Sequence, residues 1–377
     1  MTQSPWGQPP RQRPAQQWSN PPAPWGQPQW PAPGPQRGRP PAQWPGQPVW
    51  GQPTGGAPGP TFPPPRAPQR PNPLRTLFLA MSALAVVALL GLIAVNVSGV
   101  GSSSDVAWAN EDYQVPPETS SPPELPAYPT TFEEAYAALE ENPLYSQQMP
   151  EPVRCELPPG EPAQMSDREL DAYFTEQMAC LTRAWQPPTS AAGYVEVRPP
   201  VTIYRDQVTS GCGSMEGAEA VNAFYCPADQ AVYFSTLMFE YLPDLREPRI
   251  AELVMAHEYG HNVQARTNLL LPAHILMANI DDEDAQLEIS RRLEVQADCF
   301  AGTFFNSTHQ SLQLTDQDFA AMEQALFNIG DDQLSGDPDV VGNHGRGASR
   351  QLWGERGWET TALSSCNTFT APSGEVE

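Results

Sequence analysis

Residues 252–265 read ELVMAHEYGHNVQA, and the pentapeptide HEYGH lies inside them. On an α-helix, residues four apart lie one turn above each other, so His257 and His261 can present their imidazoles to one metal ion. Glu258 lies beside them but turns away from direct ligation, where it can take a proton from a metal-bound water. The motif therefore predicts a helix over about 248–267 that carries two metal ligands and the base of a zinc hydrolase.

A catalytic zinc site also needs a third protein ligand and an open position for water. The continuation HExxHxxGxxH is excluded, because Gln264 and Thr267 stand where that pattern has glycine and histidine. Further along the chain, RRLEVQADCFAG places Glu294 and Asp298 one helical turn apart. We expect Glu294 to be the third ligand, and Asp298 to accept the free N–H of a ligating histidine, which we take to be His257.

Four separated motifs resemble those of the bacterial, membrane-anchored family of putative neutral zinc metallopeptidases: HEYGHNVQ, LEVQADCFAG, GCGS…AFYCPADQAVYFS and IGDDQL…HGRGASRQLWGERGW…CNTF. The resemblance runs in order from about residue 143 to residue 369. It implies a zincin-like fold and one Zn²⁺ per chain, with Glu258 as the catalytic base and with His257, His261 and Glu294 as the metal ligands.

The resemblance has one departure near its C-terminal end. The family usually has a Gln-Arg pair after the HG segment, whereas the order here is Ser349-Arg350-Gln351, so no role carries over to Arg350. Because the family is largely defined by its motif, the resemblance bears on the fold and the site more than on the substrate.

The order of the expected elements indicates an α+β domain, since few strands and several helices follow one another without βαβ alternation. Ser166 and Glu169 form a capping-box pattern before a helix with an apolar stripe as far as Trp185. VTIYR (201–205) reads as a strand, and NAFYC and AVYFS around PADQ read as a hairpin. A second long helix is expected from about Asp282 to Phe305, then an acidic loop (GDDQLSGDPD) and a short helix near 348–356.

A zinc peptidase needs a further group to stabilise the oxyanion that develops on the substrate. Of the three histidines outside the motif, His344 in GNHGRG is the candidate, because it lies in a glycine-rich loop within a family motif. His274 and His309 are expected at the surface. The hairpin around NAFYC and AVYFS can offer an edge strand to an extended peptide, although its side chains fit a simple sheet core equally well.

The run Thr76–Ser104 contains no charge, and its core LFLAMSALAVVALLGLIAV is close to the roughly 20 apolar residues that cross a bilayer. Arg66, Arg70 and Arg75 precede it, and the first charge after it is Asp105. The positive-inside rule therefore places the N-terminus in the cytoplasm and the C-terminal domain outside the cell membrane, which the chain crosses once.

Composition divides the chain into further regions. Residues 1–73 hold 24 of the 46 prolines and six of the ten tryptophans, so they cannot bury a core and serve either as a spacer or as a ligand for a cytoplasmic partner. We predict a Pro/Trp/Gln-rich disordered cytoplasmic tail over 1–73, a transmembrane helix over 74–100, a linker over 101–130, and an extracytoplasmic zinc metallopeptidase domain over 131–377. Residues 105–377 carry a net charge of −31, which argues against a nucleic-acid partner.

All six cysteines lie on the predicted exported side, and an even number there suggests disulfides. The local motifs favour Cys212–Cys226, which would bracket the hairpin, and Cys155–Cys180, which would fasten the helix after Ser166. That leaves Cys299–Cys366, which would attach the C-terminal segment to the helix that carries Glu294. A cysteine-ligated zinc is the rival interpretation, but the chain has no CxxC pair.

Two classes of function fit the sequence. The leading one is a membrane-anchored zinc endopeptidase that hydrolyses peptide or protein substrates outside the cytoplasmic membrane, with the zinc-bound water activated by Glu258. The alternative is a catalytically silent, zinc-stabilised scaffold that uses its Pro/Trp-rich tail for partners. Glu258 favours the enzyme, because a structural zinc site has no need of a base and normally closes with four protein ligands.

Overall fold

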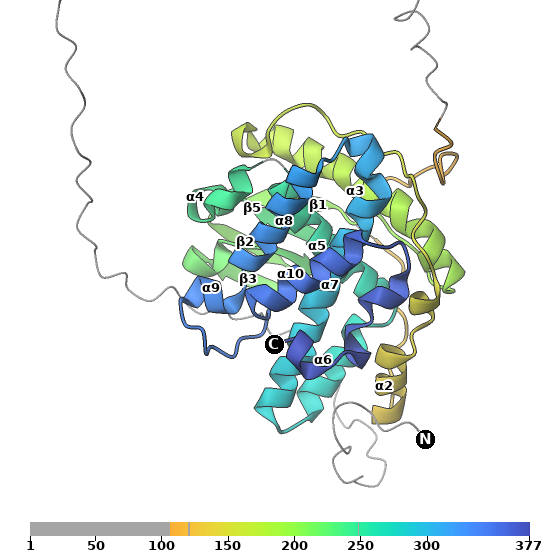
Figure 1. The fold of residues 1–377 in the computed structure, drawn as a ribbon, viewed down its shortest axis with the longest axis vertical. Helices are drawn as coiled ribbons and strands as arrows, with labels where there is room; N and C mark the ends of the chain where they lie inside the picture. The colour runs from red at the N-terminus through yellow and green to blue at the C-terminus, as the bar shows by residue number, and fades with distance from the viewer. Residues whose placement is uncertain (1–105, 120, 248) are drawn as a thin grey trace, which may run out of the picture. The chain divides into compact units, whose positions relative to one another are not determined.

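Two long helices, α5 (Ile250–Arg266) and α7 (Glu283–Leu312), carry the motifs and pack against each other. The computed structural model describes residues 106–119, 121–247 and 249–377 (Figure 1). Gly260, inside HEYGH, allows the close approach, since a Cβ there would lie 3.0 Å from the Cα of Ala297. The contact brings the residues around HEYGH next to those around Glu294.

The sheet beside α5 has the strand order β1-β5-β4. β5 pairs parallel with β1 and antiparallel with β4, so the expected hairpin is present within a mixed sheet. All five residues of β5 are buried, whereas β4 is an edge strand among the described residues and packs against α5. A second ribbon, β2–β3, was not anticipated from the sequence. The strands are β1 (Val201–Tyr204), β2 (Gln207–Ser210), β3 (Gly213–Glu216), β4 (Ala223–Cys226) and β5 (Ala231–Ser235).

The remaining helices surround this centre, and several differ from the sequence expectation. The acidic stretch expected as a loop contains the short helix α9, and α7 continues seven residues beyond Phe305 to Leu312. The helices α2, α4, α6 and α8 were not predicted. The bounds are α2 (Phe132–Glu140), α3 (Asp167–Ala191), α4 (Met238–Tyr241), α6 (Leu270–Asn279), α8 (Asp316–Asn328), α9 (Asp331–Ser335) and α10 (Gly347–Trp358).

Helix α3 runs beyond Trp185 and through Pro187 and Pro188. A proline cannot donate to the carbonyl four residues earlier, so the ring at position 187 leaves the carbonyl of Arg183 without its helical partner. The side chain of Asn110 donates to that carbonyl at 2.8 Å. A residue from the segment expected as a linker thus satisfies the backbone group that the proline leaves open.

Other contacts also hold the segment before residue 131 against the domain. Ala109 forms a parallel bridge with Val153, and Arg266 Nη1 donates to the carbonyl of Pro123 at 2.9 Å. Trp108–Glu377 fall in one compact unit. The packed part of the chain therefore begins before the boundary placed at 131.

The three expected disulfides are confirmed: Cys155–Cys180, Cys212–Cys226 and Cys299–Cys366. They leave no free cysteine in the chain. The second bridge joins the β2–β3 turn to the end of β4, and the third joins α7 to the C-terminal segment.

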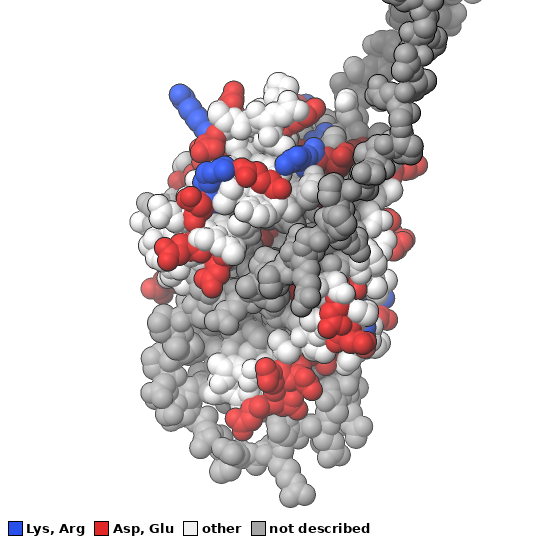
Figure 2. Space-filling view, turned by 90° about the vertical axis from the view of Figure 1, so that its left-hand side faces the viewer, with Lys and Arg blue, Asp and Glu red and all other residues white. Residues whose placement is uncertain are grey.

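Within the described ranges, no helix has the length and apolar character needed to cross a bilayer. The predicted span at 74–100 and the Pro/Trp-rich tail at 1–73 lie outside those ranges. On the face shown in Figure 2, the acidic side chains of the described residues are more widespread than the arginines.

Candidate metal centre

His257, His261 and Glu294 come together between α5 and α7, with one potential ligand atom from each within 4.8 Å of the others. Nε2 of His257 lies 3.3 Å from Oε2 of Glu294, and Nε2 of His261 lies 3.6 Å from Oε1 of the same carboxylate. In the described part of the chain, this is the one group of three or more His, Cys, Asp or Glu side chains arranged to hold a metal ion.

The donor set fits zinc. Two imidazole nitrogens and one carboxylate are the ligands of many catalytic zinc sites, which leave a fourth position open. Ligand atoms about 2.0–2.1 Å from a common tetrahedral ion lie roughly 3.3–3.4 Å apart, close to the separations across Glu294. Burial opposes ionisation of Glu294, but the imidazoles of His261 and His257 hold its pKa well below the usual value, so the carboxylate is charged.

Asp298, one turn after Glu294, lies behind His257, where its Oδ1 is 2.7 Å from Nδ1. With Nδ1–H directed to Asp298, Nε2 of His257 faces Glu294 and is the atom that would bind the metal. Burial alone would lower the pKa of His257, but Asp298 and Glu294 raise it to about 10. A proton and a metal ion therefore compete for the same nitrogen.

Arg350, to which the family resemblance assigned no role, belongs to this group. It lies in the first turn of α10 and donates through Nε to Oδ2 of Asp298 at 2.9 Å and through Nη2 to Oδ1 at 2.8 Å. Both side chains are almost completely buried, at 4% and 0% exposure. Burial disfavours a charged carboxyl, yet Arg350 and His257 hold the pKa of Asp298 below its usual value.

His261 has a different support, made of amides. Its Nδ1 lies 2.8 Å from Oε1 of Gln264, three residues later on α5. The amide nitrogen of Gln264 donates to the carbonyl of Leu293 at 2.7 Å and to Oε1 of Gln296 at 3.2 Å. Gln264 was read only as excluding the His-ligated continuation, although its spacing of three from His261 is a local sign of side-chain contact.

Glu258 is buried beside the ligands and has a backbone partner on the sheet. The N–H of Tyr225, on β4, donates to Oε2 of Glu258 at 2.9 Å. Burial raises the pKa of Glu258 above the ordinary value, and the two histidines of the motif offset part of that rise. A raised pKa suits a carboxylate that must accept a proton near neutral pH.

His344 is buried and is held by Asp331, at the start of α9. One carboxylate oxygen of Asp331, Oδ2, accepts the backbone N–H groups of His344 and Gly345, each at 2.9 Å. The other, Oδ1, lies 3.3 Å from Nδ1 of His344. His344 is also close enough to Glu294 to help lower the pKa of that carboxyl. The residues of the predicted acidic loop therefore include the group that orients His344.

His274, expected at the surface, is instead partly buried on α6 beside the centre. Burial, and next the neighbouring His261, lower its pKa to about 4. The expectation was wrong because α6 was not recognised from the sequence, and α6 packs against α7.

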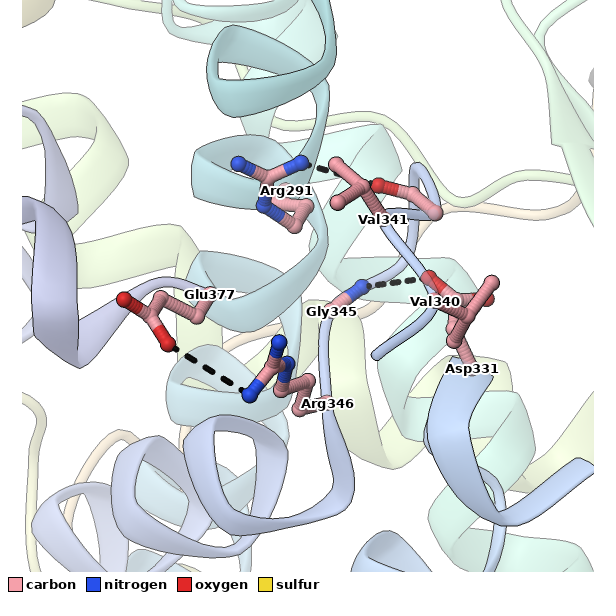
Figure 3. A pocket seen from close by; sticks show the side chains of 8 residues that line it. Arg291, Asp331, Val340, Val341, Gly345, Arg346 and Glu377 are labelled. Atoms are coloured by element: carbon pink, nitrogen blue, oxygen red, sulfur yellow. Dashed lines mark hydrogen bonds and ion pairs between the residues drawn. The ribbon is translucent and has the colours of Figure 1, made fainter. Parts of the chain in front are cut away.

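A pocket of about 190 Å³ lies beside the loop that carries His344 (Figure 3). Arg291 and Arg346 are its cationic residues. Arg291 donates to the carbonyls of Val376 and Gly342, each at 2.9 Å, and Arg346 lies 3.7 Å from the carboxylate of Glu377. Both arginines of the pocket are therefore already paired with groups of this chain. His257, His261 and Glu294 do not line the pocket.

A helix with the HExxH motif, a second helix with a carboxylate beside both histidines, and a buried glutamate beside an edge strand form the arrangement of a metallopeptidase-type centre. Residues 140–369 match the family model described as "Putative neutral zinc metallopeptidase", and the chain belongs to that family. The family implies zinc as the metal.

Curated relatives include "Uncharacterized protein YpfJ" of Escherichia coli strain K12, 31% identical over 214 residues that cover 52% of this chain and 71% of the relative. "Uncharacterized protein Mb2605" of Mycobacterium bovis and "Uncharacterized protein Rv2575" of Mycobacterium tuberculosis are each 32% identical over 206 residues, covering 50% of this chain and 66% of the relative. No solved structure matches the chain. These names state no activity.

Proposed function

We propose that this chain is a zinc-dependent endopeptidase with a zincin-like domain, one zinc ion per chain, and Glu258 as its catalytic base. The observation that carries the proposal is the position of Glu258, buried next to the three ligand residues and held by the N–H of Tyr225. A site that used metal only for stability would need neither this carboxylate nor a vacant fourth position.

Zinc, when bound by His257, His261 and Glu294, would polarise the scissile carbonyl and acidify water. The hydrogen bond from Tyr225 holds one oxygen of Glu258, so the other is left to accept a proton from the attacking water. Because burial raises its pKa, Glu258 can keep that proton and then pass it to the departing amine.

The edge of β4 that does not pair with β5 supports an extended substrate. The carbonyl of Asn222 accepts from Ser235 on β5, so by strand alternation the backbone groups of Ala223 and Tyr225 face the other way, towards α5. A peptide that pairs there would lie over Glu258, because the N–H of Tyr225 already contacts that side chain.

His344 is the proposed partner of the substrate oxyanion. Asp331 orients its ring through Nδ1, and Nε2 is the ring nitrogen that would donate to the oxyanion. Replacing His344 with Gln should lower kcat by roughly 10²- to 10³-fold with little change in zinc content. An unchanged kcat would remove His344 from the mechanism.

The test of the activity uses the purified full-length chain, loaded with zinc and incubated with a mixed peptide library. Cleavage should stop with a chelator, and Glu258→Gln should lower kcat/KM by roughly 10²- to 10⁴-fold while zinc remains near one ion per chain. Equal cleavage by this variant would exclude Glu258 as the base. Failure of the unsubstituted chain to cut any peptide would favour the zinc-stabilised scaffold.

We further propose that residues 74–100 anchor the chain in the cell membrane, with the N-terminus cytoplasmic and the zinc domain outside. The apolar run and its flanking arginines support this arrangement. Protease added to intact spheroplasts should digest the domain but not a tag at the N-terminus. Digestion of the tag alone would reverse the proposed orientation.

A further inference from the structure

Arg350 is far from the metal ligands in sequence but is joined to them by two consecutive contacts. Its guanidinium binds both oxygens of Asp298, and one of those oxygens binds Nδ1 of His257. Asp298 has no exposed surface, so its orientation depends on these partners. A planar guanidinium that offers two parallel N–H donors determines the plane of a carboxylate, which a single point charge cannot do.

The position of Arg350 depends on unusually close contact between α10 and α7. A Cβ on Gly302 would lie 2.9 Å from the Cα of Gly357, and a Cβ on Gly357 would lie 2.2 Å from the carbonyl oxygen of Cys299. The disulfide Cys299–Cys366 joins α7 to the segment after α10, beginning at the residue next to Asp298. The glycines and the disulfide therefore hold α10 where Arg350 can reach Asp298.

The charge of Arg350 is also required by its surroundings. Glu294, Asp298 and Asp331 all stabilise its charged form, and together they raise its pKa despite burial. A buried carboxylate that loses its cationic partner is strongly disfavoured in its original position. A shift of Asp298 would alter the hydrogen bond that orients His257.

We propose that Arg350 is a positioning residue of the metal centre, which holds Asp298 in the plane that directs Nε2 of His257 towards the metal. The inference rests on the zinc site of the proposed function, but not on peptide hydrolysis. In the described contacts, Arg350 makes no hydrogen bond to a metal ligand or to the substrate edge, and its hydrogen-bonded link to His257 passes through Asp298.

The experiment compares zinc affinities of the full-length chain by competition with a chromophoric chelator. Arg350→Met, which removes the charge but keeps the aliphatic stem, should weaken binding by roughly 10- to 100-fold, as for other outer partners of metal ligands. Arg350→Lys should recover part of the loss, because it restores the charge without the paired donors. The Co²⁺-loaded chain should show a changed d–d absorption spectrum for Arg350→Met.

Arg356→Met is the matched control. Arg356 lies on the same helix, pairs with Glu375 at 2.7 Å and stacks over Trp353, but does not contact Asp298. Arg356→Met should leave the zinc affinity and the Co²⁺ spectrum unchanged. An equal loss in both variants would mean that α10 acts only as a structural support, and would overturn the proposal.

A double-mutant cycle tests whether Arg350 acts through Asp298. Asp298→Asn alone and Asp298→Asn with Arg350→Met should bind zinc equally, since the first change removes the charged link. Additive losses would overturn the proposal. The double variant lacks both buried charges, so it also provides the comparison if Arg350→Met alone fails to fold.

The outcomes separate this proposal from the proposed function. If the unsubstituted chain binds zinc but cuts no peptide, the enzyme proposal fails and the affinity comparison still decides the role of Arg350. If Arg350→Met binds zinc as tightly as the unsubstituted chain, Arg350 is not a positioning residue, whatever the activity. If the unsubstituted chain binds no zinc, both proposals are overturned.

Discussion

The two histidines of HEYGH both face the carboxylate of Glu294 but are supported in different ways. Behind His257 lies a charged chain, Asp298 and then Arg350, contributed by α7 and α10. Behind His261 lies the neutral amide of Gln264, from its own helix. The first support requires three helices to assemble, whereas the second is largely in place once α5 forms. The geometry at His257 should therefore be the more sensitive to changes elsewhere in the domain.

Glu294 lies against both histidines, so its replacement should have the largest effect on zinc binding. Glu294→Ala removes the carboxylate that lies between the two Nε2 atoms, and should weaken zinc binding by more than the roughly 100-fold upper value for an outer partner. Chelator competition and metal analysis measure the effect. Glu283→Ala, an exposed residue in the first turn of the same helix, is the control, and equal zinc content in both variants would contradict Glu294 as a ligand.

Removing a disulfide tests whether the geometry at His257 depends on how α5, α7 and α10 pack together. Replacing Cys299 and Cys366 with Ala opens a loop of 67 residues, and should lower the free energy of unfolding by about 4 kcal/mol. It should also weaken zinc binding, because Cys299 adjoins Asp298.

The matched control for that prediction is replacement of Cys212 and Cys226, which close a loop of 14 residues at the sheet. That change should cost about 3 kcal/mol. Urea unfolding at fixed zinc compares the two. If removal of Cys212–Cys226 weakens zinc binding more than removal of Cys299–Cys366, the geometry at His257 does not depend on the attachment of α7 to the C-terminal segment.

Replacing Asp298 and Gln264 separately compares the support of His257 with that of His261. Hydrogen bonds to charged groups contribute about 1.5–3 kcal/mol and neutral ones about 0.5–1.5 kcal/mol. Asp298→Asn should therefore weaken zinc binding by roughly 10- to 100-fold, and Gln264→Met by roughly 10-fold or less. Similar losses in the two variants would show that the charge behind His257 has no special effect.

His274 gives an effect that appears only when the pH is changed, on the His261 side. Its pKa falls from 6.5 to about 4 on folding, so the unfolded chain takes up a proton that the folded chain does not. Stability from the neutral form is present above pH 6.5 and is lost as the pH falls towards 4. When the pH is lowered from 7 to 5, the free energy of unfolding of the unsubstituted chain should fall. In His274→Gln that fall should be smaller by about 2 kcal/mol.

Urea unfolding at the two pH values measures that difference, with His309→Gln as a histidine control outside the centre. An equal pH dependence with and without His274 would mean that the environment of its ring does not change on folding. His261 would then lack the neutral neighbour that the structure places beside it.

Sequence patterns were most informative where the chemistry lies along one helix. The spacing of His257 and His261, the adjacent Glu258, and the Glu294–Asp298 pair each follow from helical periodicity. The three cysteine pairs also followed from their positions around recognisable elements. By contrast, Arg350 is 52 residues from Asp298, and no local pattern relates the two.

Contacts between segments far apart in the sequence also explain the expectations that were wrong. His274 was expected at the surface because α6 was not recognised, and Asp331 was read as part of an acidic loop. The segment before residue 131 was read as a linker because its prolines and polar residues form no periodic pattern. It packs on the domain through single contacts such as Asn110 with the carbonyl that Pro187 leaves open.

The sequence by itself determined which residue types meet on each helix, because the turn of an α-helix places side chains at positions i and i+4 on one face whatever surrounds it. Tertiary structure alone decided that Arg350 completes Asp298 and that Tyr225 holds Glu258. These contacts join separate elements, and their geometry depends on how burial, close glycine contacts and a disulfide set α5, α7, α10 and β4 against one another.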